Sequence, residues 1–293
     1  MKHLQIYRFI LDVAQQGSIR KSAERLHITP SALTRRIQDF EEEFGTQIFE
    51  RLPQGMRLNA AGELLIRHIR DHNAQLDRLQ SQVADLSGVR RGHVAIVCSQ
   101  ALAEGVVPDQ IAAYRRQRPL VSFSIQVKDR AEGVSSLANF EADLALLLDP
   151  PPVSELRELV VTQLPVCAMV SASHPLAKED TVRLRDCCRF PLAMPNPTLA
   201  LRMILDKALI RRQLEPDIPI ESSSLEFLRS YAMREQAVAF HVLSGKPRTF
   251  GGMCAKPIDK RDVDPIRTVL GQLRGRPLST AAAKFADQLG NHL

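Results

Sequence analysis

The segment that decides the fold runs from Gly17 to Ile37 and reads GSIRKSAERLHITPSALTRRI. Gly17 ends a first predicted helix, whose apolar residues recur at the helical period, and Ser18 can cap a second helix. Thr29 is a natural N-cap for a third helix, and Pro30 follows at the first helical position, where its missing N–H group leaves no hydrogen bond unmade. The segment therefore predicts two helices joined by a tight turn.

The third predicted helix has an inner apolar face and an outer polar face. At about 100° per residue, Ser31, Arg35 and Gln38 point away from the inner face and can meet base edges, and Arg35 suits a bidentate contact with guanine. Residues 48–51 and 56–58, joined by a turn, predict a small β-wing. The inner face consists of Leu33, Ile37, Phe40 and Phe44.

Cationic and hydroxyl side chains cluster around this outer face, which favours DNA binding by a winged helix-turn-helix domain at residues 1–58. Those at the start of the second helix and on the shoulders of the third suit backbone phosphates, and Arg51 and Arg57 flank the tip of the wing. The acidic run 41–43 would repel DNA, so only the first half of the third helix should enter the groove. The predicted DNA-binding residues are Ser18, Arg20, Lys21, Thr29, Pro30, Ser31, Thr34, Arg35, Arg36, Gln38, Arg51 and Arg57.

A long linker helix is predicted at residues 59–87, with Asn59 as its N-cap. Its apolar positions step alternately by four and three, as in the seam of a two-stranded coiled coil, and polar residues flank them. We expect the seam to pack on a second copy of the chain, with His72 as a polar core residue that fixes the register. The alternative is a helix that packs on its own domain. The seam consists of Leu65, Ile69, His72, Leu76, Leu79, Val83 and Leu86.

The rest of the chain, after an expected hinge at residues 88–91, alternates strands with helices. This order predicts an α/β domain at residues 92–293, with parallel sheets in two lobes. The first lobe takes about 92–163 and 268–293, and the second takes about 164–267. The fold class is therefore α/β overall, with an all-α winged helix-turn-helix at the N-terminus.

The composition fits a cytoplasmic protein. The 39 Lys and Arg residues outnumber the 33 Asp and Glu residues, and the resulting net charge of +6 permits nucleic acid as a partner. Polar residues interrupt the apolar ones at the N-terminus, which predicts no signal peptide, and no apolar stretch is long enough to span a bilayer. The five cysteines are expected to be reduced thiols.

No motif for metal, cofactor or catalytic chemistry stands out. Cys187 and Cys188 are adjacent without paired histidines, so we predict no zinc site, and a vicinal disulfide is the alternative. Cys98 ends a strand, where a small buried apolar residue is the first interpretation and a redox-reactive thiol the second. The sequence holds neither a glycine-rich phosphate loop nor a supported Ser–His–Asp arrangement, so we expect no catalytic residues and no cofactor.

Several stretches follow one another in the order and spacing of a known family: Phe9, Gly17-Ser18, 23–26, 31–37, Glu41, Gly45, 48–51 and 58–62. Through them residues 1–87 resemble the N-terminal part of LysR-type transcriptional regulators, and 92–96 and 142–146 resemble that family's effector-binding half more weakly. The resemblance implies a dimerising linker helix, two lobes similar to periplasmic solute-binding proteins, and tetramers built as paired dimers. Where the family often has Gln and then Pro, this chain has Pro30 and Ser31, so the usual contact of Gln with adenine is not carried over.

The ligand of a two-lobed α/β domain binds outside the carboxyl ends of the strands, at the lobe boundary. The resemblance implies that residues 99–101, which follow the first strand, contact the effector, and the helix that opens there offers N–H groups to an anion. Residues 195–198 open a helix in the second lobe and face it. Asp149 would disfavour an anion if it faced the cleft. The predicted effector-binding residues are Ser99, Gln100, Ala101, Leu148, Asp149, Asn196, Pro197, Thr198, Phe240 and His241.

Together these features predict an effector-responsive, non-enzymatic transcription regulator that binds a pseudo-palindromic operator as a dimer or tetramer. The expected partners are double-stranded operator DNA, a small-molecule effector such as an organic acid, a second copy of the chain and RNA polymerase. The alternative is a cytosolic solute-binding protein or an enzyme that uses the two-lobed half. Residues 1–87 distinguish the two, because neither alternative role needs them.

Overall fold

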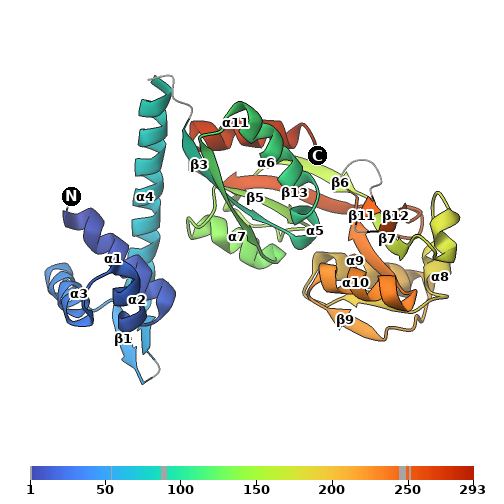
Figure 1. Cartoon of the computed structure of the whole chain (residues 1–293), viewed down its shortest axis with the longest axis horizontal. Coiled ribbons are helices and arrows are strands. Elements are labelled where there is room, and N and C mark those ends of the chain that lie inside the picture. The colour runs from blue at the N-terminus through green and yellow to red at the C-terminus, as the bar shows by residue number, and fades with distance from the viewer. Residues whose placement is uncertain (1, 54, 87–90, 244–248, 251) are drawn as a thin grey trace. The chain divides into compact units, whose positions relative to one another are not determined.

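The chain divides into two compact units, which we call the head (Met1–Leu76) and the body (Asp77–Leu293). Each is described by itself. The expected hinge at 88–91 and the turn of the predicted wing fall partly outside the described residues. The computed structural model (Figure 1) describes all residues except 1, 54, 87–90, 244–248 and 251.

The head begins with three helices, and the residues predicted to cap the second and third do so. The Ser18 hydroxyl accepts a hydrogen bond from the Lys21 N–H group at 3.4 Å, and the Thr29 hydroxyl accepts one from the Ala32 N–H group at 3.2 Å. Both contacts satisfy N–H groups that the first helical turn leaves unpaired. In chain order the elements are α1 (Lys2–Gln16), α2 (Ile19–Leu26), α3 (Pro30–Phe44), β1 (Phe49–Leu52), β2 (Gly55–Leu58) and α4 (Ala60–Leu86), which continues into the body.

The core of the head joins the helices to the wing and to the start of α4. Leu33 and Ile37 are buried as predicted, whereas the prediction for Phe44 is wrong, since its side chain is 47% exposed. Phe44 is the last residue of α3, and its ring lies outside the core, where it stacks on the ring of Phe40 with 5.5 Å between centroids. The buried residues are Phe9, Ile10, Val13, Ala23, Leu33, Ile37, Ile48, Phe49, Leu65, Ile66 and Ile69.

The first part of α4 packs on its own domain. Leu65 and Ile69, the first two positions of the predicted seam, are buried in the core of the head together with Ile66. Asn59 caps the helix as predicted, because its side-chain oxygen accepts a hydrogen bond from the Gly62 N–H group at 2.9 Å. For this part of the helix, the alternative of packing within one chain is therefore correct.

The second part of the seam is exposed. Leu79 and Val83 are 56% and 54% exposed, although both are large apolar side chains. His72 is also exposed, so in the single chain it is not a core residue. The side chain of Leu86 lies outside the described ones. Apolar side chains left open at heptad positions are those that a partner helix would cover.

Lobe I of the body is built on a five-stranded sheet of order β4-β3-β5-β13-β6. Helices α6 and α11 lie along one face and α7 along the other (Figure 1). The ring of Tyr114 on α6 packs edge-on against Phe285 of α11, with 5.4 Å between centroids. The elements are β3 (Gly92–Cys98), α5 (Gln100–Ala103), α6 (Val106–Gln117), β4 (Val121–Val127), α7 (Arg130–Ala138), β5 (Leu144–Leu148), β6 (Leu156–Leu164), β13 (Ile266–Leu273) and α11 (Thr280–Gly290).

Lobe II is built on a six-stranded sheet of order β11-β12-β7-β10-β8-β9. The chain enters it at Pro165, between β6 and β7, and returns to lobe I between β12 and β13. The elements are β7 (Val166–Ser171), the 3₁₀ turn η1 (Pro175–Lys178), α8 (Leu184–Cys187), β8 (Leu192–Pro195), α9 (Ala200–Arg212), β9 (Ile220–Ser222), α10 (Leu225–Glu235), β10 (Val238–Val242), β11 (Thr249–Phe250) and β12 (Met253–Pro257).

Neither sheet is wholly parallel, so that part of the prediction is wrong. Strand β3 runs parallel to β4 and β5, and β8 runs parallel to β9 and β10. In contrast, β13 runs antiparallel to β5 and β6, and β7 runs antiparallel to β10 and β12. Strands β13 and β7 are the first strands after the chain has crossed from one lobe to the other, where no helix precedes them to reverse the direction. The short edge strand β11 also runs antiparallel to its neighbour β12.

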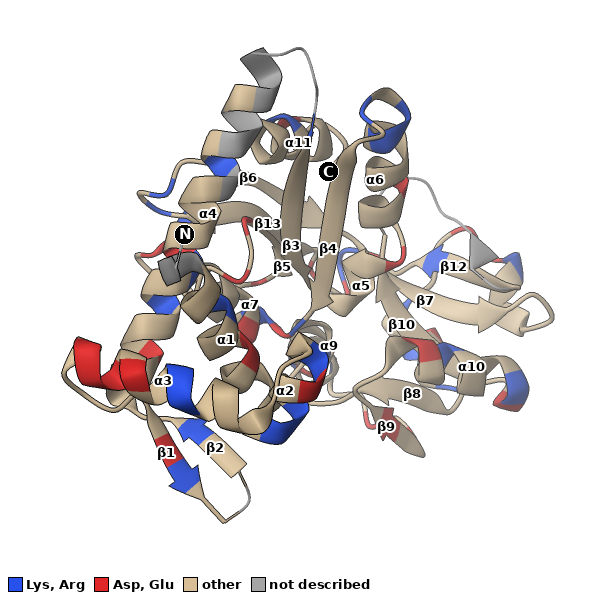
Figure 2. Ribbon diagram, turned by 60° about the vertical axis from the view of Figure 1, so that its left-hand side comes forward, with Lys and Arg blue, Asp and Glu red and all other residues tan. Residues whose placement is uncertain are grey.

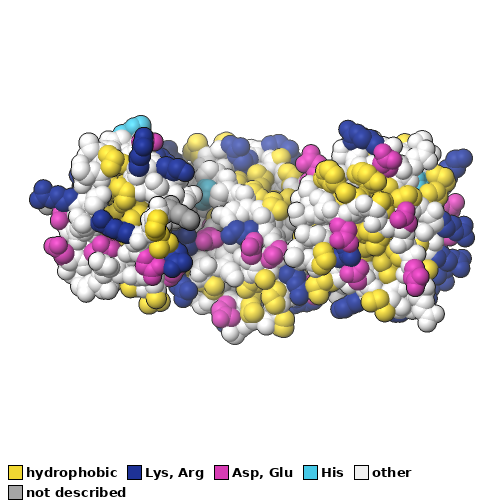
Figure 3. Space-filling view, turned by 90° about the horizontal axis from the view of Figure 1, so that it is seen from below, with side chains coloured by type: hydrophobic (Ala, Val, Ile, Leu, Met, Phe, Trp, Pro, Cys, Tyr) yellow, Lys and Arg dark blue, Asp and Glu magenta, His cyan; other side chains and the backbone are white. Residues whose placement is uncertain are grey.

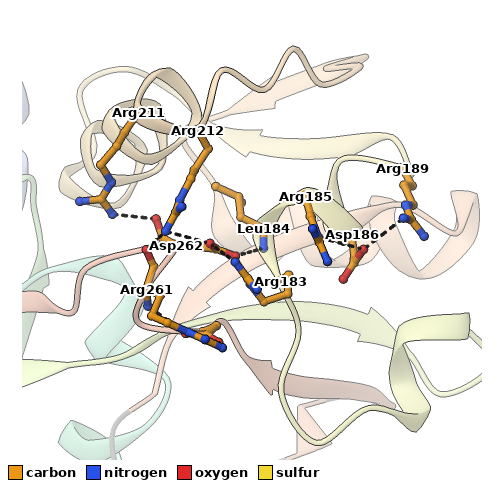
Figure 4. A network of polar contacts seen from close by, with 10 residues as sticks. Arg183, Leu184, Arg185, Asp186, Arg189, Arg211, Arg212, Arg261 and Asp262 are labelled. Carbon is orange, nitrogen blue, oxygen red and sulfur yellow. Dashed lines mark hydrogen bonds and ion pairs between the residues drawn. The ribbon is translucent and has the colours of Figure 1, made fainter.

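A buried carboxylate ties three segments of lobe II together (Figure 4). The side chain of Asp262 is 3% exposed and accepts hydrogen bonds from Arg183 at 2.7 and 2.8 Å and from the Leu184 N–H group at 3.1 Å. Arg212, the last residue of α9, also pairs with it at 3.2 Å. The hydrogen bonds from Arg183 hold the pKa of Asp262 below its usual value. The cluster fixes the start of α8 to the end of α9.

Candidate functional site

The surface of the head around α2, α3 and the wing carries most of the residues predicted to contact DNA. Figure 2 shows Lys and Arg on α2, on α3 and on both strands of the wing, and a group of acidic residues at the end of α3. In the space-filling view, basic side chains also lie on the displayed face of the head (Figure 3). Ser31, Arg35 and Gln38 are all exposed on α3, so this half of the helix is free to approach another surface.

The cations of this surface differ in their partners. Arg20 pairs with Glu24 at 3.3 Å and Arg57 pairs with Glu50 at 2.7 Å, both at exposed positions. Exposed pairs of this kind contribute little energy and exchange partners easily. The guanidinium of Arg36 lies over the ring of Phe9, 5.1 Å from its centroid.

Three other cations of this surface are exposed and form no ion pair with a described carboxylate. These are Lys21, Arg35 and Arg51. They lie on α2, α3 and β1, so each element of the surface contributes one. Such an array can neutralise phosphates of a nucleic-acid backbone without first giving up a partner.

The acidic run at the end of α3 has a role that the sequence analysis missed. The Glu41 carboxylate accepts hydrogen bonds from the Ile48 and Phe49 N–H groups at 2.8 and 3.3 Å, which attaches the first strand of the wing to the recognition helix. The predicted repulsion of DNA therefore does not rest on Glu41, whose charge is directed into the protein. No local pattern indicated this role, because the donors follow Glu41 by seven and eight residues, beyond the end of α3.

The wing is also held from its other side. The Met56 N–H group donates a hydrogen bond to the Gly17 carbonyl at 2.8 Å. Gly55 has a φ of 139°, and a Cβ atom at this position would lie 2.3 Å from the Gly17 oxygen, so only glycine allows this approach. The end of α1 and the end of α3 thus fix the wing in one place. Arg51 and Arg57 are presented from a rigid element.

The body contains a cleft between its lobes, with a volume of about 350 Å³ that includes its open part. Four of the predicted effector-binding residues line it: Ser99, Gln100, Ala101 and Leu148. Seven further residues line it that the sequence analysis did not name: Lys128, Asp129, Arg130, Leu199, Ala200, Leu201 and Leu225. Residues 128–130 could have been found, because β4 lies beside β3 in parallel and their carboxyl ends meet at one edge.

Six predicted residues do not line the cleft, and one of them, Asp149, forms an ion pair with the lining residue Arg130. Asn196, Pro197 and Thr198 precede the lining residues of lobe II, and the Asn196 side-chain oxygen accepts hydrogen bonds from the Thr198 N–H and hydroxyl groups at 3.3 and 2.8 Å. These residues form a turn. Phe240 and His241 are 1% and 2% exposed inside β10, and burial lowers the pKa of His241. Every residue of strand β10 is buried, including those at its carboxyl end, so Phe240 and His241 do not reach the cleft.

The leading predicted residues already accept hydrogen bonds from the protein, Ser99 within lobe I and Gln100 from lobe II. The Ser99 hydroxyl accepts a hydrogen bond from the Leu148 N–H group at 3.0 Å, and the Gln100 side-chain oxygen accepts one from the Leu225 N–H group at 3.1 Å. Glu104 forms an ion pair with Arg229, one turn further along α10. Gln100 and Glu104 therefore join α5 of lobe I to α10 of lobe II.

The anion site expected at the helix after β3 stays a prediction, and the helix found there is short. Helix α5 spans only Gln100–Ala103, a single turn, and its N-terminal residues serve the contact with α10. A single turn carries too small a dipole to hold an anion by itself. Charge recognition in the cleft therefore needs the charged side chains as well.

The charged side chains of the cleft are paired with one another. Lys128 donates hydrogen bonds to Glu141 at 2.9 Å and to Ser136 at 2.8 Å. Arg130 donates to the Asp149 carboxylate at 2.8 Å and to the Asp149 carbonyl at 2.9 Å. The third charged lining residue, Asp129, accepts hydrogen bonds from the Ala131 and Glu132 N–H groups, so the cleft has no excess of positive charge.

Asp149 has an unusual backbone that supports its contact with Arg130. Its φ is 42°, in the left-handed region, and it directly follows the buried strand β5. The other described non-glycine residues with positive φ are His27, Phe140, Gln213 and Gln236, and each follows the end of a helix. Asp tolerates this left-handed backbone better than most residues with a side chain.

Two of the cysteines and the possible metal ligands are further candidate reactive groups. Burial raises the pKa of Cys98 to about 11 and that of Cys187 to about 12, so both thiols stay protonated near neutral pH. Among the described residues, no three or more His, Cys, Asp or Glu side chains form a group that could hold a metal ion. No described helix has the length and apolar content needed to cross a membrane.

Both halves of the chain match known protein families. Residues 4–63 match the sequence model described as the bacterial regulatory helix-turn-helix protein of the lysR family, and residues 87–293 match the LysR substrate binding domain. The HTH-type transcriptional activator CmpR of Synechocystis sp. is 26% identical over 231 residues, which cover 78% of this chain and 76% of the relative. The HTH-type transcriptional regulator CbbR of Xanthobacter flavus is 26% identical over 239 residues, covering 81% of this chain and 72% of the relative.

Solved structures have the same fold at low identity. CbnR, in its full-length complex with target DNA, has a TM-score of 0.71 at 17% identity, and the match covers 99% of each chain. Full-length OxyR from Pseudomonas aeruginosa has a TM-score of 0.71 at 18% identity, covering 98% of this chain and 94% of that one.

Proposed function

The chain belongs to the LysR family of DNA-binding transcription regulators, which are not enzymes, and on this premise we propose how its surfaces divide the work. The head binds a pseudo-palindromic operator as part of a dimer or tetramer. The cleft of the body binds a small effector, and its occupancy changes operator bending or the contact with RNA polymerase. The protein acts in the cytoplasm, where bacterial DNA lies.

The observation that carries this proposal is the set of unpaired cations on the head. Arg35, exposed on the first half of α3, is the candidate for a guanine contact, flanked by Ser31 and Gln38. Lys21 and Arg51 are placed to neutralise phosphates on either side. The remaining proposed contacts, which suit the DNA backbone or the edge of the groove, are Ser18, Arg20, Thr29, Pro30, Thr34, Arg36 and Arg57.

The exposed part of the α4 seam supports the dimer. Leu79 and Val83 are more than half exposed at heptad positions, and a second α4 would cover both. We expect Leu79→Glu to shift the full-length protein toward monomer in sedimentation velocity, because a charge would enter the seam. Leu64→Glu is the matched control, since Leu64 is 65% exposed on the part of the helix that belongs to the head. Equal effects of both variants would argue against the seam.

The paired charges of the cleft suggest how an organic acid would bind. The guanidinium of Arg130 has a geometry that matches a carboxylate, and its partner Asp149 is 42% exposed and can be displaced. An acid that replaced Asp149 on Arg130 would bind beside Gln100. Since Gln100 accepts a hydrogen bond from Leu225 of the other lobe, such a ligand acts directly on the contact between the lobes. It shifts the arrangement of the lobes to the extent that it binds one arrangement more tightly than the other.

The test is DNA binding by the full-length protein. Fluorescence anisotropy with the region upstream of its own gene, in the presence of excess random duplex, should give a specific complex that the random duplex does not remove. A thermal-shift screen of small organic acids should identify ligands that also change this affinity. Binding that random duplex abolishes completely, together with tight binding of an acid, would favour a solute-binding protein or enzyme instead.

A further inference from the structure

A second pocket of the body lies at the opposite end of strand β3 from the cleft. It is lined by the end of α6, the start of α11 and the residue before β3, and its volume of about 240 Å³ includes its open part. Three of its residues are cations and none is acidic. The lining residues are Arg91, Tyr114, Arg118, Val121, Thr280, Ala281 and Lys284, and we call this the Arg118 pocket.

The floor of the Arg118 pocket is rigid. Tyr114 is 1% exposed, and its hydroxyl donates a hydrogen bond to the Ala281 carbonyl at 3.0 Å, which joins α6 to α11. The Tyr114 ring also packs against Phe285, and Phe285 packs against Phe123 with 4.9 Å between ring centroids. Such a platform fixes the position of any group that stacks on it.

Arg118 stacks on this platform with part of its guanidinium unsatisfied. Its guanidinium carbon lies over the Tyr114 ring, 4.5 Å from the centroid, so the charged fork is held in one orientation. The Nε atom is buried and has no hydrogen-bond partner among the described residues, and one terminal nitrogen reaches Gln117 only at 3.5 Å. A buried donor left without an acceptor is costly, so an acceptor beside Arg118 would be favoured.

The charge of the Arg118 pocket contrasts with that of the cleft. In the cleft, each cation is neutralised by a carboxylate: Lys128 by Glu141 and Arg130 by Asp149. For Arg118 and Lys284, no ion pair with any described carboxylate is present. Lys284 lies one turn along α11 from Thr280, which adds a hydroxyl group to the same pocket.

We propose that the Arg118 pocket binds a small anion that carries a phosphate group. The fixed fork of Arg118 matches two phosphate oxygens, the ammonium of Lys284 supplies a second charge, and the Thr280 hydroxyl can donate to a third oxygen. Arg91, the residue before β3, adds further positive charge. The bound anion ties the first turn of α11 to the last turn of α6, independently of the effector in the cleft.

The test is isothermal titration of the full-length protein with inorganic phosphate, at constant ionic strength maintained with chloride. The wild type should bind one phosphate ion, and Arg118→Gln and Lys284→Gln should each weaken this binding about tenfold or more. Arg115→Gln is the matched control, because Arg115 is exposed on the same helix, carries the same charge and does not line the pocket. It should change the affinity less than about twofold.

Two results would overturn the proposal. The first is an absence of phosphate binding by the wild type, or an equal loss in all three variants, which would reduce the effect to general surface charge. The second concerns the source of the phosphate: if inorganic phosphate does not bind but Arg118→Gln and Lys284→Gln weaken binding of random duplex DNA, the pocket contacts a DNA backbone. Lys284→Gln guards against misfolding, since Lys284 is exposed and its variant should keep the wild-type unfolding temperature.

Discussion

The head and the cleft use their cations in opposite ways. In the head, Arg35 and Arg51 are exposed, and within the described residues no carboxylate pairs with either. In the cleft, Arg130 donates hydrogen bonds to both the carboxylate and the backbone carbonyl of Asp149. An unpaired cation is ready for a polyanion, whereas a paired cation admits an anion only by exchange. The difference separates a surface suited to DNA from a site suited to selective binding of a small ligand.

Paired and unpaired charges should also differ in how much they stabilise the fold, and the largest effect is expected for a paired charge. Asp262→Ala in lobe II removes the acceptor for Arg183 and for the Leu184 N–H group, and it should lower the free energy of unfolding by about 2–4 kcal/mol. Arg35→Ala should change that free energy by less than about 0.5 kcal/mol, because Arg35 is exposed and forms no ion pair with a described carboxylate. Urea denaturation of both variants measures the difference. Similar losses would show that the unpaired cations are structural after all.

Arg35→Ala should instead act on DNA binding. Loss of a base contact should weaken the complex with the operator by about 1–3 kcal/mol and relax one base preference, with little change on random duplex. Arg20→Ala is the control, since Arg20 already pairs with Glu24 and is proposed to contact phosphate. It should weaken binding to both duplexes alike. An equal loss on both duplexes for Arg35→Ala would make it a phosphate contact.

Glu41 tests whether the wing must be fixed for the head to bind. Glu41→Ala leaves the Ile48 and Phe49 N–H groups without their acceptor and should weaken operator binding by about 1–2 kcal/mol. Glu41→Gln keeps an acceptor oxygen and should recover most of that loss. Anisotropy with the operator distinguishes them. If both variants bind more tightly than the wild type, the charge of Glu41 acts by repelling DNA, as first expected, and not by holding the wing.

Asp149→Asn tests the exchange proposed for the cleft. The change removes the charge that competes for Arg130 and keeps a residue that tolerates a left-handed backbone. The affinity for the acid that most stabilises the wild type should rise about tenfold, as measured by calorimetry. A weaker or unchanged affinity would place the carboxylate of the effector away from Arg130.

The smallest effect concerns pH. Because Arg183 holds the pKa of Asp262 below its usual value, the carboxylate contributes stability above that usual value, and this contribution is lost as the pH falls through the lowered pKa. The difference in unfolding free energy between the wild type and Asp262→Asn should therefore be constant from pH 7 to about 5 and shrink below about pH 4. A difference that grows on acidification would contradict the pairing.

The head was the more predictable half because its signals are local. Ser18, Thr29 and Asn59 cap helices within three residues of their partners, and the apolar period placed Leu33 and Ile37 inside. The cleft was predicted only in part. Ligands bind outside the carboxyl ends of strands, and this rule locates strand ends but not the directions of their side chains. It selected Ser99 to Ala101 and Leu148 correctly as lining residues, and it failed for Phe240 and His241 because β10 is buried on both faces.

The sequence by itself determined the helices of the head, their caps, the wing and the family, because caps and periodic faces depend on residues close together in the chain. Only the tertiary structure decided which charges are free. Arg130 and Asp149 are brought together by two strands on either side of β3, and no local pattern distinguishes them from Arg35. The same holds for Arg118 and Lys284, whose shared pocket exists only because α6 and α11 pack together. Pairing between distant residues is a property of packing, and here it separates the paired Arg130 of the cleft from Arg35, Arg118 and Lys284, which form no ion pair with a described carboxylate.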